Sequence, residues 1–210
     1  MSSHVATAIL DWGAASCALA GETVCGDQYL VCQLATGMLV AVADGLGHGP
    51  EACAAGKCAL EQLGQGNGLS LQERVQHCHE ALKKTRGAAV SLAFFEPGAG
   101  TVSWTGVGNV EARLLPANLG APGSRAAKFM LTRPGVLGSY LPAPRLETLP
   151  VFPGDVLIMF TDGVDDLLMP ALPLHLPPQA LAENILLLHG KGTDDALVLV
   201  VCYRGGRHEC

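Results

Sequence analysis

Aromatic and charged residues are scarce in this chain of 210 residues, at 5% and 15% of the sequence. Hydrophobic residues make up 49%, so there is ample material for a sizeable core. Because Ala, Gly, Val and Leu take the place of aromatic residues, we expect closely packed layers. The length suits one large domain. We predict a single domain over residues 1–204 and a flexible tail over 205–210.

Long apolar runs and a secretion signal are also missing. No run of about 18 apolar residues occurs, so we expect no membrane-spanning segment. The N-terminal sequence MSSHVATAIL lacks the basic start and the long apolar centre of a signal peptide. We therefore expect a cytoplasmic protein that has no membrane partner.

Basic residues are few and scattered. Lys and Arg number 13 against 19 Asp and Glu, which gives a formal net charge of −6. Only Lys83, Lys84 and Arg86 stand close together, which argues against nucleic acid and anionic membrane as partners. The 8 cysteines include no Cys-x-x-Cys pair. We interpret most of them as small buried hydrophobic residues rather than as a disulfide framework.

The most informative stretch is Met38–Gly49, which reads MLVAVADGLGHG. Its apolar run predicts a central strand that is buried on both faces. Asp44 follows directly, and an unpaired carboxylate is costly where a buried strand ends. Glycines at alternate positions allow the backbone to come close to whatever Asp44 holds. The alternative is an ordinary turn, since Asp-Gly is a common turn pair.

The same arrangement recurs twice more. The apolar strand predicted over 156–160 is followed by Asp162, and the one over 196–203 is preceded by Asp194 and Asp195. If the last strand runs antiparallel to the other two, these acids meet at one end of the sheets, and Asp27 joins them from another strand start. Converging carboxylates repel each other unless cations lie between them. Oxygen ligands alone favour Mg²⁺ or Mn²⁺ over Zn²⁺.

Turn and capping signals predict the remaining elements. We expect helices over 50–63, 71–84 and 177–189, the second opened by the capping box Ser70-x-x-Glu73. Further strands are predicted over residues 6–10, 14–20, 29–32, 88–95, 101–107, 109–115 and 128–132. The Pro- and Gly-rich segment 116–150 is otherwise expected to be irregular.

These motifs, taken in order, resemble one family. The series is Gly26-Asp27-Gln28-Tyr29, Ala43 to Gly49, Val107-Gly108-Asn109, Pro153-Gly154-Asp155, Thr161-Asp162-Gly163 and Asp194-Asp195. It is similar to the metal-dependent PP2C-type (PPM) serine/threonine phosphatases, in particular to their bacterial SpoIIE/RsbX branch. The lone-domain length and the stretch from Lys84 to Ala88 resemble the stressosome feedback phosphatases of that branch.

The resemblance implies an α+β fold, a four-layer α-β-β-α sandwich of two mainly antiparallel sheets flanked by helices. It implies two Mn²⁺ or Mg²⁺ ions per site, with a third ion as an open alternative, and a water activated by the two metals. The implied substrates are phosphoserine or phosphothreonine in STAS-domain regulatory proteins of bacterial stress signalling. We expect a monomer that binds no nucleic acid.

Site residues follow from the same resemblance, position by position. Asp44 would bridge the two ions, and the carbonyl of Gly45 would bind one of them. Asp162 and Asp194 would hold the other ion, with Asp194 preferred over Asp195. Asp27 would bind a metal or its water. The catalytic set implied is Asp44, Asp162 and Asp194.

The sequence also departs from the family pattern. Many relatives carry His directly after the first Asp-Gly, where this chain has Leu46. His48 is the candidate general acid in its place, and a loop His with no catalytic role is an equal alternative. No Arg precedes Gly26 to hold phosphate, so phosphate would rest mainly on the metals. Arg86 is a separate candidate for a substrate contact, and a solvated charge at a helix end is the favoured alternative.

Two other functions stay open at this point. One is a pseudophosphatase that binds the phosphoprotein without cleaving it, although none of the three central acids is missing. The other is a two-metal hydrolase of small phosphate esters. The absence of a Gly-x-x-x-x-Gly-Lys phosphate loop counts only mildly against the second.

Overall fold

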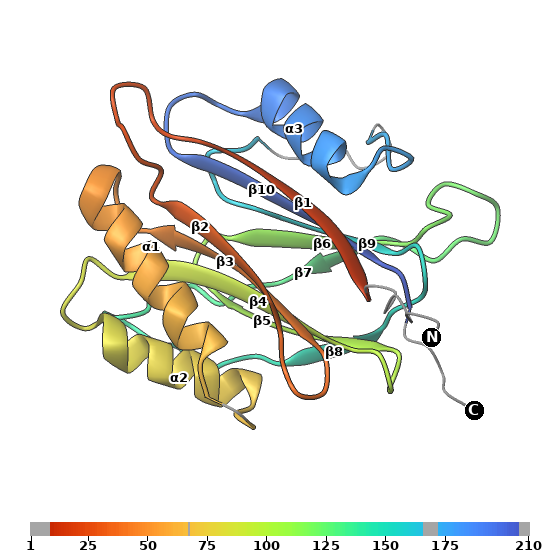
Figure 1. Cartoon of the computed structure of the whole chain (residues 1–210), viewed down its shortest axis with the longest axis horizontal. Coiled ribbons are helices and arrows are strands. Elements are labelled where there is room, and N and C mark those ends of the chain that lie inside the picture. The colour runs from red at the N-terminus through yellow and green to blue at the C-terminus, as the bar shows by residue number, and fades with distance from the viewer. Residues whose placement is uncertain (1–8, 67, 166–171, 206–210) are drawn as a thin grey trace, which may run out of the picture.

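Two five-stranded antiparallel sheets stacked between helices form the protein in a computed structural model, which describes residues 9–66, 68–165 and 172–205. The first sheet has the order β1-β10-β9-β6-β7 and the second β2-β3-β4-β5-β8. Helices α1 and α2 cover the second sheet and α3 covers the first (Figure 1). The four-layer α-β-β-α sandwich expected from the sequence is confirmed. No helix in the described residues has the length and apolar character needed to cross a membrane.

The elements follow one another as strands, two helices, more strands, a helix and a last strand. The strands are β1 Leu10–Cys17, β2 Asp27–Gln33, β3 Met38–Gly45, β4 Ala88–Glu96, β5 Thr101–Val107, β6 Glu111–Leu115, β7 Lys128–Met130, β8 Glu147–Pro150, β9 Val156–Phe160 and β10 Ala196–Tyr203. The helices are α1 Gly49–Gly64, α2 Leu71–Leu82 and α3 Pro178–His189.

Alternating side chains of the apolar strands fill three separate cores. On β3, Val40 and Val42 pack between the sheets, whereas Leu39, Ala41 and Ala43 pack against α1 and α2. Strands β9 and β10 divide in the same way between the inter-sheet core and the layer under α3. Both faces of these strands are therefore buried, which explains their unbroken apolar sequences.

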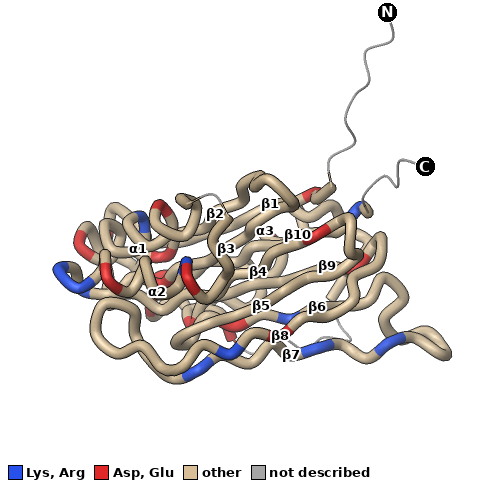
Figure 2. The backbone as a smooth tube through the Cα atoms, turned by 90° about the horizontal axis from the view of Figure 1, so that it is seen from below, with Lys and Arg blue, Asp and Glu red and all other residues tan. Residues whose placement is uncertain are grey.

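Charged residues lie mainly on the helices and connecting loops, and the strands of both sheets carry few of them (Figure 2). The capping box that opens α2 is present: the Ser70 side chain accepts from the Glu73 amide, and Glu73 accepts from the Ser70 amide. This satisfies two amides that the first helical turn leaves without partners. The helix predicted at 71–84 therefore begins where its capping signal places it.

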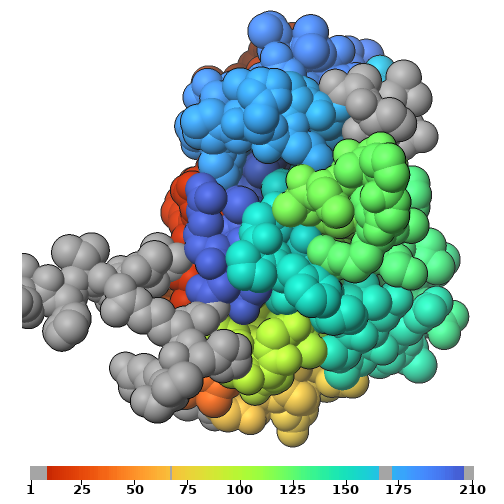
Figure 3. Space-filling model, turned by 90° about the vertical axis from the view of Figure 1, so that its right-hand side faces the viewer, coloured from red at the N-terminus to blue at the C-terminus, as the bar shows by residue number. Residues whose placement is uncertain are grey.

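Two expectations were wrong in detail. Strands predicted over 6–10 and 14–20 are one strand, β1, in the described residues, and residues 6–8 lie outside them. The predicted irregular segment 116–150 contains, besides β7, the short strand β8 at the edge of the second sheet. The long connection between β6 and β7 projects from the surface (Figure 3, green). Of the described cysteines, Cys17 is exposed, and none forms a disulfide bond.

Candidate metal centre

Three strand-end carboxylates line one cleft of about 530 Å³. Asp44 belongs to the end of β3, Asp162 follows β9, and Asp194 precedes β10. Because β10 runs antiparallel to β9, the start of β10 lies beside the end of β9, at the sandwich end opposite Leu10 and Tyr203. The cleft thus takes one acid from the second sheet and two from the first.

Asp27 lies behind these three acids. It is the register partner of Asp44 across β2 and β3, and it is only 3% exposed. The Thr161 hydroxyl donates to Asp27 Oδ2 at 2.6 Å and accepts from the Leu197 amide at 2.9 Å. A link between the sheets therefore passes through Asp27 and Thr161, directly beneath the cleft.

Burial and mutual repulsion raise the pKa of two of these carboxyl groups. Burial, and then the neighbouring charge of Asp44, raises the pKa of Asp27 to about 8. Burial, and then the charge of Asp162, raises the pKa of Asp44 to about 7, although a hydrogen bond from Asn109 acts in the opposite direction. Both shifts disfavour the charged carboxylates, as expected where acids gather without a counter-charge.

Asp194 and Asp195 point to different surroundings. Asp195 is 3% exposed, and its two oxygens accept from the Leu19 and Gly26 amides, each at 2.8 Å. Asp194 is exposed in the cleft, and within the described residues it accepts one hydrogen bond, from the Asp195 amide at 2.8 Å. Asp195 therefore fastens loops together, whereas Asp194 keeps oxygen lone pairs free for a ligand.

The turn that carries Asp162 is held from two sides. Asn109 Nδ2 donates to Asp162 Oδ2 at 2.6 Å, and Lys191 Nζ donates to the Asp162 carbonyl at 2.6 Å. The Lys191 amide also donates to the Gly163 carbonyl at 2.9 Å. These contacts hold the turn and its carboxylate from residues on two separate loops.

The glycine of each Asp-Gly pair allows a close backbone approach. A Cβ atom at Gly45 would lie 2.0 Å from the Ala52 carbonyl oxygen of α1, and one at Gly163 would lie 2.0 Å from the Asp195 carbonyl oxygen. Any side chain would push these segments apart. The repeated Asp-Gly motif therefore reflects packing next to the cleft as well as turn formation.

The other two candidate site residues, His48 and Arg86, are not among the residues that line the cleft. His48 Nδ1 contacts Glu22 Oε1 at 2.6 Å, and the cleft lining includes Leu46 and Gly47 but not His48. Arg86 pairs with Glu51, and its Nη1 would lie 2.8 Å from a Cβ atom at Gly47. Arg86 thus lies at the rim of the cleft.

Divalent cations fit this cleft on charge and ligand type. Within the described residues, no three His, Cys, Asp or Glu side chains already form a ligand set. The cleft lining nevertheless brings three carboxylates together and includes no Lys or Arg to neutralise them. Carboxylate and carbonyl oxygens are the ligands that Mg²⁺ and Mn²⁺ prefer.

Sequence reasoning assigned no role to three residues that support the acids: Asn109, Thr161 and Lys191. Asn109 and Thr161 belong to the motif series and lie within two residues of the end of a strand, so their position was a usable signal. Lys191 lies in the loop after α3, and nothing in its local sequence indicates a contact with the turn at Asp162.

Comparison with known proteins places this geometry in a family. The family described as Stage II sporulation protein E (SpoIIE) matches residues 35–204. The chain is 29% identical over 168 residues to phosphoserine phosphatase RsbX of Bacillus subtilis (strain 168), covering 79% of this chain and 78% of RsbX.

Solved structures show the same fold. A chain from work on the bacterial stressosome, a modular system adapted to control secondary messenger signalling, has a TM-score of 0.82 and 30% identity, covering 91% of this chain and 98% of that one. RsbX in complex with magnesium has a TM-score of 0.79 and 20% identity, covering 92% and 95%. The chain therefore belongs to the SpoIIE family, and its fold is that of the PP2C-type phosphatases.

Proposed function

We propose that this protein is a metal-dependent phosphoserine/phosphothreonine protein phosphatase that acts on phosphoproteins of bacterial stress signalling. The observation that carries the proposal is the meeting of Asp44, Asp162 and Asp194, from two sheets, in one cleft without basic residues. Such a cleft needs cations, and cations held there recruit phosphate.

The residues divide into ligands and supports. Asp44 and the Gly45 carbonyl would hold one metal ion, and Asp44, Asp162 and Asp194 would hold another. Asp27 contributes behind them, to a metal or its water. Asp195 is a support, because both of its oxygens are engaged by backbone amides. When bound, Mn²⁺ or Mg²⁺ ions supply an activated water, an orienting contact for phosphate and charge stabilisation for the leaving oxygen.

Arg86 contacts the phosphoprotein at the rim of the cleft. Its partner Glu51 is a surface residue, with a side chain 72% exposed. Exposed ion pairs of this kind are weak, so Arg86 can exchange Glu51 for an acidic or phosphorylated group without a large loss. His48, by contrast, contacts Glu22 and does not line the cleft.

The relatives support the choice of substrate. RsbX is a phosphoserine phosphatase, and a chain 30% identical to this one comes from work on the stressosome. Phosphorylated STAS-domain regulators in the cytoplasm are accordingly the proposed substrates, and the protein acts on them as a monomer.

Release of phosphate tests the proposal directly. Purified protein should release inorganic phosphate from a phosphorylated STAS-domain protein when Mn²⁺ is present and not when it is chelated. The Asp44→Asn variant should bind the phosphoprotein but release no phosphate. Asp11→Asn is the matched control, because Asp11 is an exposed acid on β1 that pairs with Arg204 at the other end of the sandwich. Unchanged turnover by Asp44→Asn would refute the metal-centre assignment.

The same assay separates the alternatives. Binding without turnover by the unaltered protein would make it a pseudophosphatase. Turnover of small phosphate esters with no turnover of any phosphoprotein would make it a small-molecule hydrolase.

A further inference from the structure

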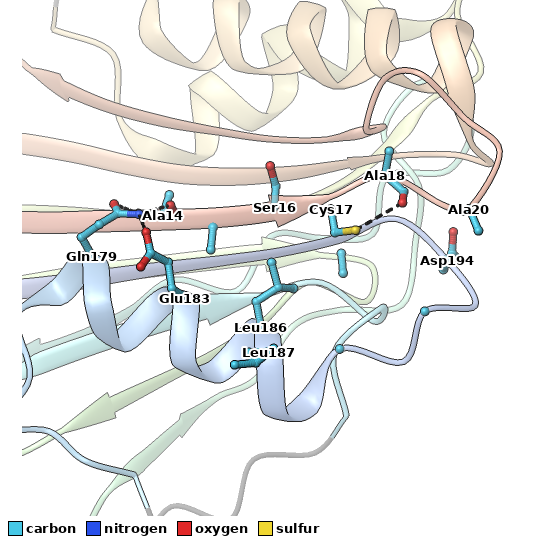
Figure 4. Close-up of a pocket in the computed structure, with 14 residues that line it drawn as sticks. Ala14, Ser16, Cys17, Ala18, Ala20, Gln179, Glu183, Leu186, Leu187 and Asp194 are labelled. Atoms are coloured by element: carbon cyan, nitrogen blue, oxygen red, sulfur yellow. Dashed lines mark hydrogen bonds between the residues drawn. The ribbon is translucent and has the colours of Figure 1, made fainter.

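A second and larger hollow, of about 730 Å³, lies between β1 and α3 (Figure 4). Gln179 and Glu183 lie at one end of it and Asp194 at the other, with Leu186 and Leu187 of α3 between them. We call this hollow the β1–α3 groove. Its strand side is built from small residues: Ala14, Ala15, Ser16, Cys17, Ala18 and Ala20. The groove is therefore wide enough for side chains of another polypeptide.

The strand side of the groove is an open sheet edge. Among the residues that the structure describes, β1 is the last strand of its sheet and pairs with β10 alone. The Gln179 side chain donates to the Ala14 carbonyl at 3.0 Å and accepts from the Ala14 amide at 3.1 Å, as a neighbouring strand would. The backbone groups of Ala14 therefore point away from β10.

Ser16 has the same orientation, because residues two apart on an antiparallel strand face the same side. The register of β1 with β10 is continuous through Ser16, without a bulge. Ser16 is exposed, and no hydrogen bond links its outward amide or carbonyl to any part of the chain that the structure describes. One backbone donor and one acceptor are thus open at the groove, which is what an added strand requires.

Asp194 lines both the groove and the metal cleft. The loop of residues 190–194 forms part of the groove wall, and Lys191 within it holds the turn of Asp162. A polypeptide in the groove consequently ends beside the candidate metal ligands.

The charged residues that line the groove indicate which kind of peptide can bind there. Glu183 and Asp194 are the charged residues among those that line the groove, and no Lys or Arg is among them. An acidic peptide would be repelled, whereas an apolar peptide with a basic residue would fit. Leu187 is 81% exposed and offers such a peptide an apolar contact.

We propose that the β1–α3 groove docks the residues that flank the phosphorylated side chain of the phosphoprotein substrate. These residues form an extended, apolar segment that adds to β1 at Ser16 and leads the phosphate past Asp194 into the cleft. The inference rests on the proposed function, since it presumes a phosphoprotein substrate, and it adds where that substrate binds outside the cleft.

Two variants and two matched controls test the groove. Ser16→Pro removes the outward amide, and Ser16→Ala keeps it; proline is tolerated where the amide of an edge strand faces outward. Leu187→Asp places a repelling charge in the groove, and Leu188→Asp places the same charge on a neighbouring residue, 66% exposed, that does not line it. Circular dichroism and the turnover of p-nitrophenyl phosphate report whether each variant is folded and active.

The substrates are phosphoserine peptides whose three flanking residues, on either side, are Val-Lys-Val or Glu-Ser-Glu. The unaltered protein should prefer the first by about tenfold in kcat/KM. Ser16→Pro and Leu187→Asp should lose that preference while keeping their p-nitrophenyl phosphate rate, and both controls should keep it.

Three results would overturn the inference. The preference could be absent from the unaltered protein, or it could survive in both groove variants. Light scattering could also show a dimer that Ser16→Pro dissociates without any change in peptide kinetics, which would assign the edge to a second copy of the chain. Each leaves the proposed function intact, because that function fails only if no phosphoprotein or phosphopeptide is hydrolysed at all.

Discussion

Asp27 and Asp44 are register partners on adjacent strands, and both carboxyl groups keep their protons to an unusually high pH. The pair lies where β2 begins and β3 ends, with Asp44 in the lining of the cleft and the buried Asp27 behind it. Binding of a cation and binding of protons at this pair exclude each other.

Metal affinity should therefore depend on pH. The pKa of Asp27 is about 8 and that of Asp44 about 7, so a metal ion must displace protons below these values. We expect the affinity for Mn²⁺ to rise from about pH 6 to about pH 9, with release of protons. Isothermal titration calorimetry in buffers of different ionisation enthalpy measures both quantities. An affinity that stays constant over this range would contradict the prediction.

The stability of the metal-free protein should show the opposite trend. Both groups have folded-state pKa values above the ordinary 3.8. Their contribution to folding is fully present below about pH 4 and is lost as pH rises through about 7 to 8. With a chelator present, the melting temperature should fall between about pH 4 and about pH 8 and level off above that range. The fall should be smaller in Asp27→Asn, and an equal fall in that variant would exclude Asp27 as a source.

Substitution of Asp195 should lower the stability of the protein, whereas substitution of Asp194 should abolish its activity. Asp195→Ala leaves the Leu19 and Gly26 amides without acceptors, which should cost roughly 2–4 kcal/mol in the free energy of unfolding. Asp194→Asn should change stability by less than about 0.5 kcal/mol, as surface substitutions usually do, yet abolish metal-dependent turnover. Urea unfolding and phosphate release measure the two effects. Interchanged results would make Asp195 the metal ligand.

Replacement of His48 should have little effect on the reaction. His48 contacts Glu22 and does not line the cleft, so His48→Ala should lower kcat by less than about threefold, whereas loss of a general acid typically costs about 10²–10⁴-fold. The pH profile of kcat is the measurement, with Glu22→Gln as the control for the contact itself. A loss of a hundredfold or more in His48→Ala alone would restore the histidine as the proton donor.

Arg86 should affect binding more than chemistry. Arg86→Ala should raise KM for the phosphoprotein about five- to tenfold with kcat little changed, because the side chain lies at the rim of the cleft and not among its lining residues. Arg86→Lys should restore part of the binding, and Lys84→Ala is the control for a general loss of positive charge. Equal effects of Arg86→Ala and Lys84→Ala on KM would argue for long-range attraction in place of contact.

The layers of the fold were expected from the family resemblance, and the meeting of the acids was predictable from local sequence. Apolar strands with an Asp at one end are strong signals, because burial of both strand faces and the cost of a buried charge leave few other interpretations. The capping box at Ser70 and Glu73 likewise determined where α2 begins. In these places, the residues of one segment are enough to predict its structure.

The rest depended on contacts between segments far apart in the chain. Two separate strands were predicted over residues 6–10 and 14–20, but β1 continues through Gly13, where α3 packs so closely that a Cβ atom would lie 2.3 Å from the Gln179 Cα. Strand β8 is short and gains its order from pairing with β5. Asp194 and Asp195 are identical neighbours in sequence, and only the distant Leu19 and Gly26 amides distinguish them.

The cleft draws Asp44 from one sheet and Asp162 and Asp194 from the other. If the three acids hold cations as proposed, neither half of the sandwich can assemble the ligand set alone, so a newly made chain would acquire its cations only after both sheets have docked. Damage that loosens the two halves would then remove activity entirely instead of slowing it. Loading with metal would in this sense be the last step of folding, reached only by molecules whose two sheets are correctly joined.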